Sequence, residues 1–180
     1  MEDEKELIKR LQSPNTRERA FKELLTLYKE RLYWHIRKIV ISHSDTDDVL
    51  QNTFIKVYKN IDGFKGNSKL YSWLYRIATN ESLTFLNKAS KRLKISSEEL
   101  QQQIIDNLEA DIYFDGDEIQ IQLQKAIATL PQKQQIVFNM KYFDGIKYSD
   151  MSEILDTSEG ALKASYHLAI KKIEAYLKQD

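Results

Sequence analysis

The sequence predicts an all-α fold: two small helical domains joined by an acidic flexible linker, the second a four-helix domain with a helix-turn-helix. Only five glycines and two prolines interrupt 180 residues, a composition that favours helices with short connections. Apolar residues recur with a period of about 3.6 on both sides of residues 96–118, which lack strong periodicity. We therefore assign residues 1–95 and 119–180 to the two domains and residues 96–118 to the linker.

The first domain is predicted to begin with two helices. A short helix carries apolar residues at helical spacing up to Leu11 and stops at the break formed by residues 13–15. Thr16 is the expected N-cap of a longer helix, whose apolar positions continue to Val40. This periodicity predicts that the longer helix packs along one face.

Two further helices are expected to complete the first domain. Ser44, Asp45 or Thr46 can cap the third helix. Residues 62–68 contain two glycines and are typical of a loop, after which a fourth helix is predicted over about 70–87.

The linker and the first half of the second domain are less regular. Residues 93–118 are rich in Gln, Glu and Asp, with a helical turn expected near 98–108. A helix from Ile119 is expected to end at Pro131, which can then open the next helix, buried up to Phe143.

The last two helices have the spacing of a helix-turn-helix. The two helices are predicted over residues 148–155 and 159–177, and each is amphipathic. A short turn, residues 156–158, joins them. In such a motif the second helix can enter a major groove. A helical hairpin without a DNA role fits the same pattern.

The net charge of zero is a cancellation between segments. Residues 1–95 carry a net charge of +7, residues 96–118 carry −8, and residues 119–180 carry +1. The first domain is therefore the part that can attract a polyanion.

The segment 61–92 mixes aromatic and basic side chains in a way that suits nucleic acid. Its members are Phe64, Tyr71, Trp73, Tyr75, Phe85, Lys65, Lys69, Arg76, Lys88, Lys91 and Arg92. Aromatic faces can stack on unpaired bases at about 1–3 kcal/mol per base, while cations follow the phosphates. Several of these aromatic residues also recur at helical spacing, which is typical of a core, and for Trp73 and Tyr75 we favour core packing.

Catalysis is not expected. His35, His43 and His167 are scattered, and no glycine loop suited to phosphate is present. The absence of cysteine removes disulfides and thiolate metal sites. We expect a non-enzymatic protein with no cofactor and no metal.

The sequence also indicates the cellular location of the protein. The acidic amino terminus does not resemble a secretion signal, and no apolar run approaches the roughly 20 residues of a membrane span. We expect a cytoplasmic protein that does not insert into a membrane.

Two motif sets in a fixed order resemble a known family. They are DTDDVLQNTFIKVYKNIDGFKGNSKLYSWLYRIATNESLTFL at 45–86 and LPQKQQIVFNMKYFDGIKYSDMSEILDTSEGALKASYHLAIKKIEAYL at 130–177. With both, the chain resembles bacterial RNA polymerase sigma factors of the extracytoplasmic-function (ECF) group, within the sigma-70 family. The resemblance implies a transcription initiation factor that directs core polymerase to promoters and helps to melt them.

The resemblance also implies three sets of contact residues. For the surface that grips the clamp helices of the largest polymerase subunit, they are Asp47, Asp48, Gln51, Asn52 and Phe54. For the reader of the minus-ten promoter element, which flips a base out of the duplex, they are Phe64, Lys65, Asn67, Ser68, Lys69, Leu70, Tyr71, Asn80, Lys88 and Arg92. For the helix that reads the minus-thirty-five element, they are Lys163, Ala164, His167, Leu168, Lys171 and Lys172.

The partners that the resemblance implies are core RNA polymerase, through its clamp helices and flap region, and promoter DNA. An anti-sigma factor is a further expected partner. The acidic linker can mimic nucleic acid in the polymerase channel or serve as a solvated spacer.

The chain departs from the family pattern in its second domain. Ala161 replaces the usual threonine, and Ala164, Leu168 and Ile170 stand where polar or basic residues are frequent. Readout of DNA shape is therefore expected to carry more of the specificity. Lys147 stands where relatives have a Ser or Thr cap, so a looser helix start is expected.

Two other functions fit parts of the pattern. A free-standing helix-turn-helix regulator would bind duplex DNA tightly without polymerase. A helical interaction protein would use all its aromatic residues as core and show no salt-dependent DNA affinity.

Overall fold

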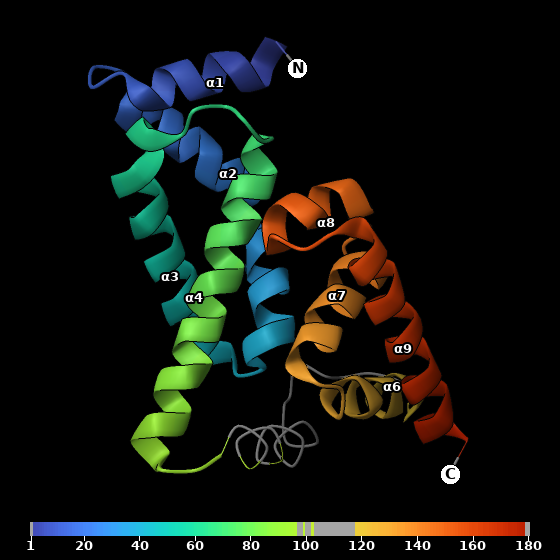
Figure 1. Ribbon diagram of the computed structural model, residues 1–180. Coiled ribbons are helices and arrows are strands. Elements are labelled where there is room, and N and C mark those ends of the chain that lie inside the picture. Colours follow the sequence, from blue (N-terminus) through green and yellow to red (C-terminus); the bar gives the residue numbers. More distant parts are fainter. Residues whose placement is uncertain (1, 97–98, 100–101, 103–117, 179–180) are drawn as a thin grey trace. The chain divides into compact units, whose positions relative to one another are not determined.

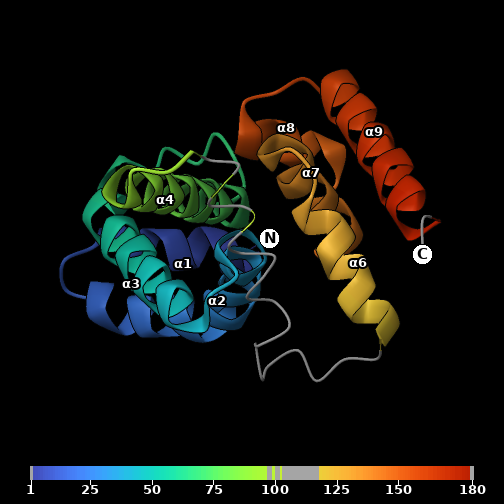
Figure 2. The same ribbon diagram turned by 90° about the horizontal axis from the view of Figure 1, so that it is seen from below.

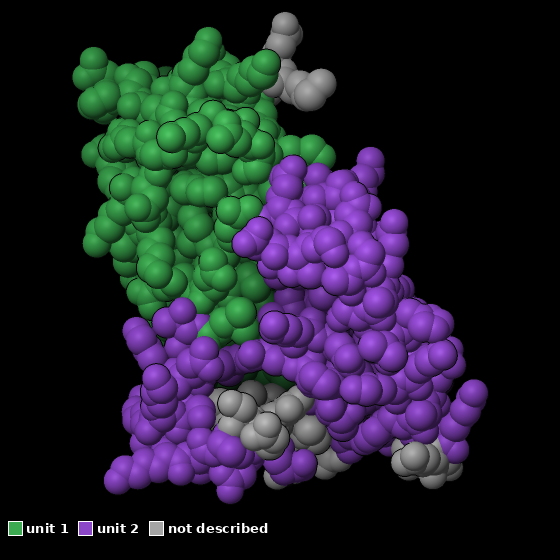
Figure 3. All heavy atoms as spheres, in the orientation of Figure 1, with its two compact units in different colours: residues 1–83 green, residues 84–180 purple. Residues whose placement is uncertain are grey.

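The computed structural model describes residues 2–96, 99, 102 and 118–178, and every regular element among them is a helix (Figure 1). The chain divides into two compact units, residues 1–83 and 84–180, coloured separately in Figure 3. The predicted all-helical fold with two domains is confirmed. The helical turn expected near 98–108 and most of the predicted linker lie outside the described residues.

The first unit is built from α1 (Glu2–Gln12), α2 (Arg17–Val40), α3 (His43–Asn60), the 3₁₀ turn η1 (Ile61–Gly63) and the first half of α4 (Leu70–Leu93). The helices α2, α3 and α4 lie side by side in Figures 1 and 2. Their facing sides form a core whose fully buried members include Leu24, Leu32, Ile36, Val57 and Leu74. The apolar residues that recur with a helical period in the sequence lie on the side of each helix that faces this core.

A buried polar contact joins α2 to α4 inside that core. His35 Nε2 lies 2.8 Å from the hydroxyl of Thr79, and the ring of His35 lies 4.7 Å from that of Tyr75. Tyr75 is buried, so its predicted role as a core residue is confirmed. A hydrogen bond satisfies the polar atom that burial would otherwise leave without water.

One predicted helix cap is wrong, and another lies at the predicted position without making a side-chain cap bond. The helix α3 is capped by Ser42, whose hydroxyl accepts a hydrogen bond from the Asp45 amide at 3.4 Å, and not by a residue from 44 to 46. Thr16 is the N-cap residue of α2, as predicted, but its hydroxyl donates to the Arg10 carbonyl at 2.8 Å and makes no cap bond with α2. Several neighbouring Ser, Thr and Asp side chains can act as caps, and the path of the chain selects among them.

The second unit contains the end of α4 and then α6 (Glu118–Ala128), α7 (Gln132–Tyr142), α8 (Tyr148–Leu155) and α9 (Glu159–Leu177). The last helix packs against α6, α7 and α8. The core cluster of the second unit comprises Ala126, Ile127, Leu130, Phe138, Ala169 and Ile173. The ring of Phe138 is stacked with those of Tyr142 and Tyr166, at centroid distances of 5.1 and 5.7 Å.

The turn between α8 and α9 has the geometry of a helix-turn-helix. Asp156 ends α8 in the left-handed conformation, with φ of 50° and ψ of 48°. Ser158 then caps α9 by accepting a hydrogen bond from the Ala161 amide at 3.3 Å. Lys147, at the start of α8, makes no side-chain cap bond, as predicted from its replacement of a Ser or Thr.

Candidate nucleic-acid interface

A short loop between η1 and α4 presents polar and basic side chains to solvent. Gly66 takes a positive φ of 70°, a conformation that glycine adopts at little cost. Lys65, Asn67 and Lys69 on either side of it are exposed. The ammonium of Lys69 lies 5.7 Å from the ring centroid of Tyr71, which orients this cation.

Buried apolar residues fix both ends of this loop. Phe64 is only 7% exposed, and its ring lies 5.1 Å from that of Trp73. Leu70 is fully buried at the start of α4. These two residues, both predicted to read the minus-ten element, hold the loop against the core and leave the cations and Asn67 outside.

The outer face of α4 continues the polar surface. Trp73, Arg76 and Asn80 follow one another at spacings of three and four residues, so they share a face of the helix. Asn80 and Arg76 are exposed, and Trp73 is half-buried. Farther along the same helix, Lys88 and Arg92 are exposed as well.

The surface of α3 combines polar residues with an apolar groove. Asp47, Asp48, Gln51 and Asn52, which were predicted to contact polymerase, are all exposed, whereas Phe54 is buried with its ring against Phe21. Beside them, apolar atoms line an open groove between α2 and α3. Its lining residues are Phe21, Leu25, Gln51, Phe54, Ile55, Tyr58 and Lys59.

The exposed apolar residues of that groove were missed by the sequence reasoning. Ile55 is 44% exposed, and Tyr58 is 39% exposed, its ring 5.0 Å from that of Phe21. Ile55 lies one helical turn after Gln51, so extending the polar stripe of α3 by four residues would have found it. Phe54 forms the floor of the groove, and Ile55 and Tyr58 offer the reachable apolar area.

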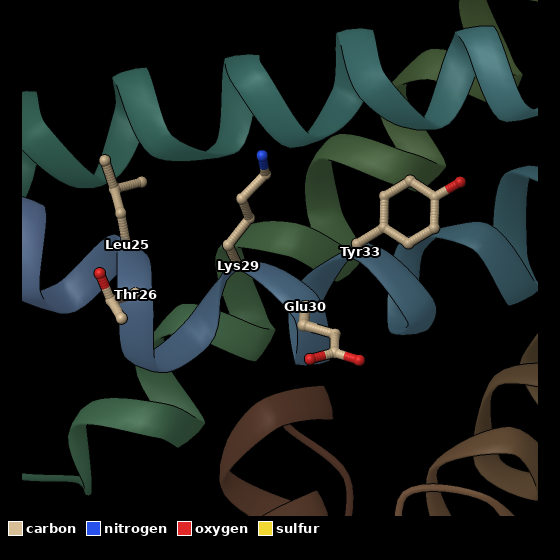
Figure 4. A pocket seen from close by; sticks show the side chains of 5 residues that line it. All are labelled: Leu25, Thr26, Lys29, Glu30 and Tyr33. Atoms are coloured by element: carbon tan, nitrogen blue, oxygen red, sulfur yellow. The ribbon is translucent and has the colours of Figure 1, made fainter.

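A second hollow lies on α2 alone and is more polar. Figure 4 shows its lining side chains, Leu25, Thr26, Lys29, Glu30 and Tyr33. Lys29 and Glu30 put opposite charges at its rim, and none of the predicted contact residues lines it. Leu25 lines both hollows and is the apolar residue that they share.

In the second unit, all six residues predicted to read the minus-thirty-five element are exposed on α9. They are Lys163, Ala164, His167, Leu168, Lys171 and Lys172. The two carboxy-terminal lysines and His167 can reach phosphates, while Ala164 and Leu168 offer apolar surface to base edges or methyl groups.

A tyrosine at the start of α8 holds one of these cations in place. The ammonium of Lys163 lies 5.6 Å from the ring centroid of Tyr148, and that of Lys141 lies 4.9 Å from it. The Glu159 carboxylate also lies 3.6 Å from the Lys163 ammonium. Burial, followed by the neighbouring Tyr166, raises the pKa of the Tyr148 hydroxyl.

Within the described ranges, no group of three or more His, Asp or Glu side chains is arranged to hold a metal ion. Among the same residues, no helix is long and apolar enough to cross a bilayer.

Two family models match the chain, and between them they cover well over half of it. Sigma-70 region 2 matches residues 24–92, and Sigma-70, region 4 matches residues 120–173. The chain belongs to the sigma-70 family. The first match contains the loop and the outer face of α4, and the second contains the helix-turn-helix of this sigma factor.

Curated relatives place the sigma factor in the ECF group. The ECF RNA polymerase sigma factor SigW of Bacillus subtilis is 29% identical over 156 residues, which cover 82% of this chain and 83% of the relative. The ECF RNA polymerase sigma-E factor of Haemophilus influenzae is 26% identical over 178 residues, covering 93% and 92% of the two chains. The alternatives of a free-standing regulator and of an interaction protein without a DNA role are set aside by these matches.

Solved structures share the fold. CnrH, in complex with the cytosolic domain of CnrY, superposes with a TM-score of 0.72 at 22% identity, over 98% of each chain. RpoE of Bartonella quintana, in complex with the anti-sigma factor NepR, gives a TM-score of 0.68 at 21% identity, over 89% of this chain and 98% of that one. Its membership of the sigma-70 family makes this chain a non-enzymatic factor that acts with core RNA polymerase on promoter DNA.

Proposed function

We propose that this ECF sigma factor divides promoter recognition among three surfaces. The loop 64–71 with Asn80 holds an unpaired base of the minus-ten element, α3 docks on the clamp helices of core polymerase, and α9 reads the minus-thirty-five element. The observation that carries the proposal is the loop itself, because exposed Lys65, Asn67 and Lys69 stand on a segment whose two ends are buried. Residues 1–95 and 119–180 would act as the two DNA-binding domains, with residues 96–118 between them.

The chemistry of the minus-ten surface fits a single strand. Flipping a base out of the stack costs a few kcal/mol, and stacking together with hydrogen bonds to the base offsets that cost. Asn80 and Asn67 offer amide donors and acceptors for a base edge, and Ser68 offers a hydroxyl. Lys65, Lys69, Lys88 and Arg92 supply phosphate contacts, with Tyr71 beside Lys69 as the aromatic surface.

The polymerase surface combines an apolar anchor with a polar rim, the usual composition of a protein interface. Ile55 and Tyr58 would fill the centre of the contact, supported by Phe54 below them. Asp47, Asp48, Gln51 and Asn52 would form its rim, where hydrogen bonds and charge set the orientation.

The minus-thirty-five surface relies on few direct base contacts. Lys171, Lys172 and His167 would bind phosphates, and Lys163 would enter the major groove first, because it lies nearest the start of α9. Ala164 and Leu168 would contact methyl groups or read groove shape.

The remaining partners follow from the family. The second domain would also contact the polymerase flap region, and the sigma factor would work in the cytoplasm. An anti-sigma factor is the expected inhibitor, since the Bartonella RpoE was solved with the anti-sigma factor NepR. CnrH was solved with the cytosolic domain of CnrY.

Replacing Asn80 with Ala tests the minus-ten proposal. We expect promoter opening in transcription assays with core polymerase to fall about tenfold, because a lost hydrogen bond to a flipped base costs about 1–3 kcal/mol. Permanganate reactivity of thymines at the upstream bubble edge would report opening, and a pull-down would show that core polymerase still binds. Asn87→Ala is the matched control, an exposed asparagine two turns farther along α4. Equal activity of the two variants would refute the role of Asn80.

Changing Tyr148 separates a cation contact from simple packing. Tyr148→Ala is expected to weaken binding to minus-thirty-five DNA about twofold to fivefold, because Lys163 loses the ring that orients it, a contact of about 0.5–1 kcal/mol. Tyr148→Phe keeps the ring and should bind nearly as tightly as the unchanged protein. Footprinting of the holoenzyme on a duplex promoter measures both. If Phe and Ala weaken binding equally, the hydroxyl and not the ring is responsible.

A further inference from the structure

The first helix of the chain holds both ends of the loop that we assign to minus-ten recognition. Residues 2–12 form α1, and Figure 1 shows α1 lying across the end of the first unit at which α3 finishes and α4 begins. Leu7 and Leu11 are buried and fix α1 to the core. Its polar residues Glu4 and Gln12 are half-buried and point at backbone groups far away in the sequence.

Gln12 holds the start of the loop. Its side-chain nitrogen Nε2 donates to the carbonyl of Ile61 at 3.1 Å and to the carbonyl of Phe64 at 2.8 Å. An amide NH₂ group has two hydrogens to donate, so both are engaged on this turn. The neighbouring Arg17 supports the same place, because its guanidinium donates to the Leu11 carbonyl at 2.9 Å and forms an ion pair with Asp62.

Glu4 holds the end of the loop. Its carboxylate oxygen Oε1 accepts a hydrogen bond from the backbone amide of Leu70, the first residue of α4, at 3.0 Å. The first amide groups of a helix have no acceptor within the helix, and a carboxylate at that end is also stabilised by the helix dipole. Glu4 therefore acts as a capping group for α4 that is supplied from 66 residues away.

The spacing of these two side chains forces the loop to arch. Glu4 and Gln12 are eight residues apart, so they stand on the order of 12 Å apart along α1. The six residue steps from Phe64 to Leu70 would reach about 20 Å if extended. A segment held at ends closer than its length must arch between them, and Gly66 supplies the left-handed turn that it needs.

We propose that α1 is a brace that presets the minus-ten loop, with Glu4 and Gln12 as positioning residues for base recognition. This inference rests on the proposed role of the loop. A loop already ordered before DNA arrives loses less conformational freedom on binding, which raises affinity for the base that fits it. Without the brace, Lys65 and Lys69 would still attract phosphates. The loop would no longer have one fixed conformation in which to hold a single base.

The experiment measures one ratio for each holoenzyme: its affinity for a minus-ten single strand divided by its affinity for a scrambled strand. Each sigma variant is assembled with core polymerase and titrated against a labelled single strand carrying the non-template minus-ten sequence of a promoter that the holoenzyme opens. A scrambled strand of the same length and composition is titrated beside it. Gln12→Glu is the central variant, because it keeps the shape of the side chain but has no hydrogen to donate to the two carbonyls.

We expect Gln12→Glu to lower the ratio about tenfold, an effect of the size that a lost pair of hydrogen bonds produces. Glu4→Ala should lower it as well, and Glu4→Gln, which retains an acceptor oxygen for the Leu70 amide, should recover a part of that loss. Glu6→Ala is the matched control, since Glu6 is an exposed glutamate on the same helix. Binding to the scrambled strand and to core polymerase should stay the same in all of them.

Three outcomes separate the possibilities. A ratio that falls for Gln12→Glu but not for Glu6→Ala supports the brace. If Asn67→Ala and Asn80→Ala lower the ratio and Gln12→Glu does not, the loop reads the base without help from α1 and the inference is overturned. If Asn67→Ala and Asn80→Ala leave the ratio unchanged, the loop is not the reader, and the proposed function fails together with the inference.

Discussion

Replacing Ile55 with Asp is expected to weaken the binding of core polymerase about a hundredfold, because a charge buried without a partner in an apolar contact costs about 3 kcal/mol or more. Ile55 is the exposed apolar residue nearest the polar rim of α3, and the groove beside it is lined by apolar atoms of Phe21, Leu25 and Tyr58. A carboxylate at this point would lose its water when the clamp helices cover the groove. Competition with the labelled, unchanged sigma factor for a limiting amount of core polymerase measures the loss.

Leu27→Asp is the control for that experiment. Leu27 is a 54% exposed leucine on α2 and does not line the groove, so the same gain of charge should change the affinity by less than about twofold. Circular dichroism of both variants would verify that they are folded. An Ile55→Asp protein that competes as well as Leu27→Asp would show that polymerase docks elsewhere.

Replacing Phe138 with Ala is expected to unfold the second unit while the first stays intact. Phe138 is 4% exposed and lies in the core cluster, stacked with both Tyr142 and Tyr166. Truncating a buried phenylalanine costs about 3–5 kcal/mol, a large part of the roughly 5–15 kcal/mol that stabilises a domain. Hydrogen exchange of the full chain should therefore show protection lost in α6, α7 and α9, but kept in α2 and α3.

Tyr142→Ala is the matched control for the stacked rings. Tyr142 is 57% exposed, so its loss removes one stacking contact of about 0.5–1.5 kcal/mol and leaves no cavity. The second unit should keep most of its protection, and the holoenzyme should still protect the minus-thirty-five element. Equal loss of protection in the two variants would mean that the exposed stack, and not the core cluster, holds the unit together.

The helices of both units could be predicted because the signals that define them are local. Pro131 stands at the start of α7, Ser158 caps α9, and the apolar period of each helix faces a core. The choice of Ser42 over Ser44 as the cap of α3 could not be predicted in this way. Both side chains carry the same hydroxyl, and only the path of the chain after α2 decides between them.

The contact surfaces depended more on the tertiary environment. Phe64 lies in a basic segment and has the chemistry of a base platform, but the ring of Trp73 covers it. Phe54 and Ile55 are adjacent apolar residues, and a small rotation of α3 decides which of them faces solvent. All six residues chosen on α9 are exposed because its buried face, with Leu162, Ala169 and Ile173, keeps a clear helical period.

The hydrogen bond from Glu4 to the start of α4 has a consequence for the order of folding. The residues that it joins are separated by 66 positions, so the contact closes most of the first unit into one loop of chain. Contacts between distant residues form slowly, because the chain must lose entropy before the contact stabilises it. On a ribosome, α1 emerges before α4, so Glu4 has no partner until Leu70 has left the exit tunnel. The loop 64–70 therefore takes its final shape late. Under the role that we propose for this loop, an incomplete first domain would have no ordered base reader with which to occupy promoters.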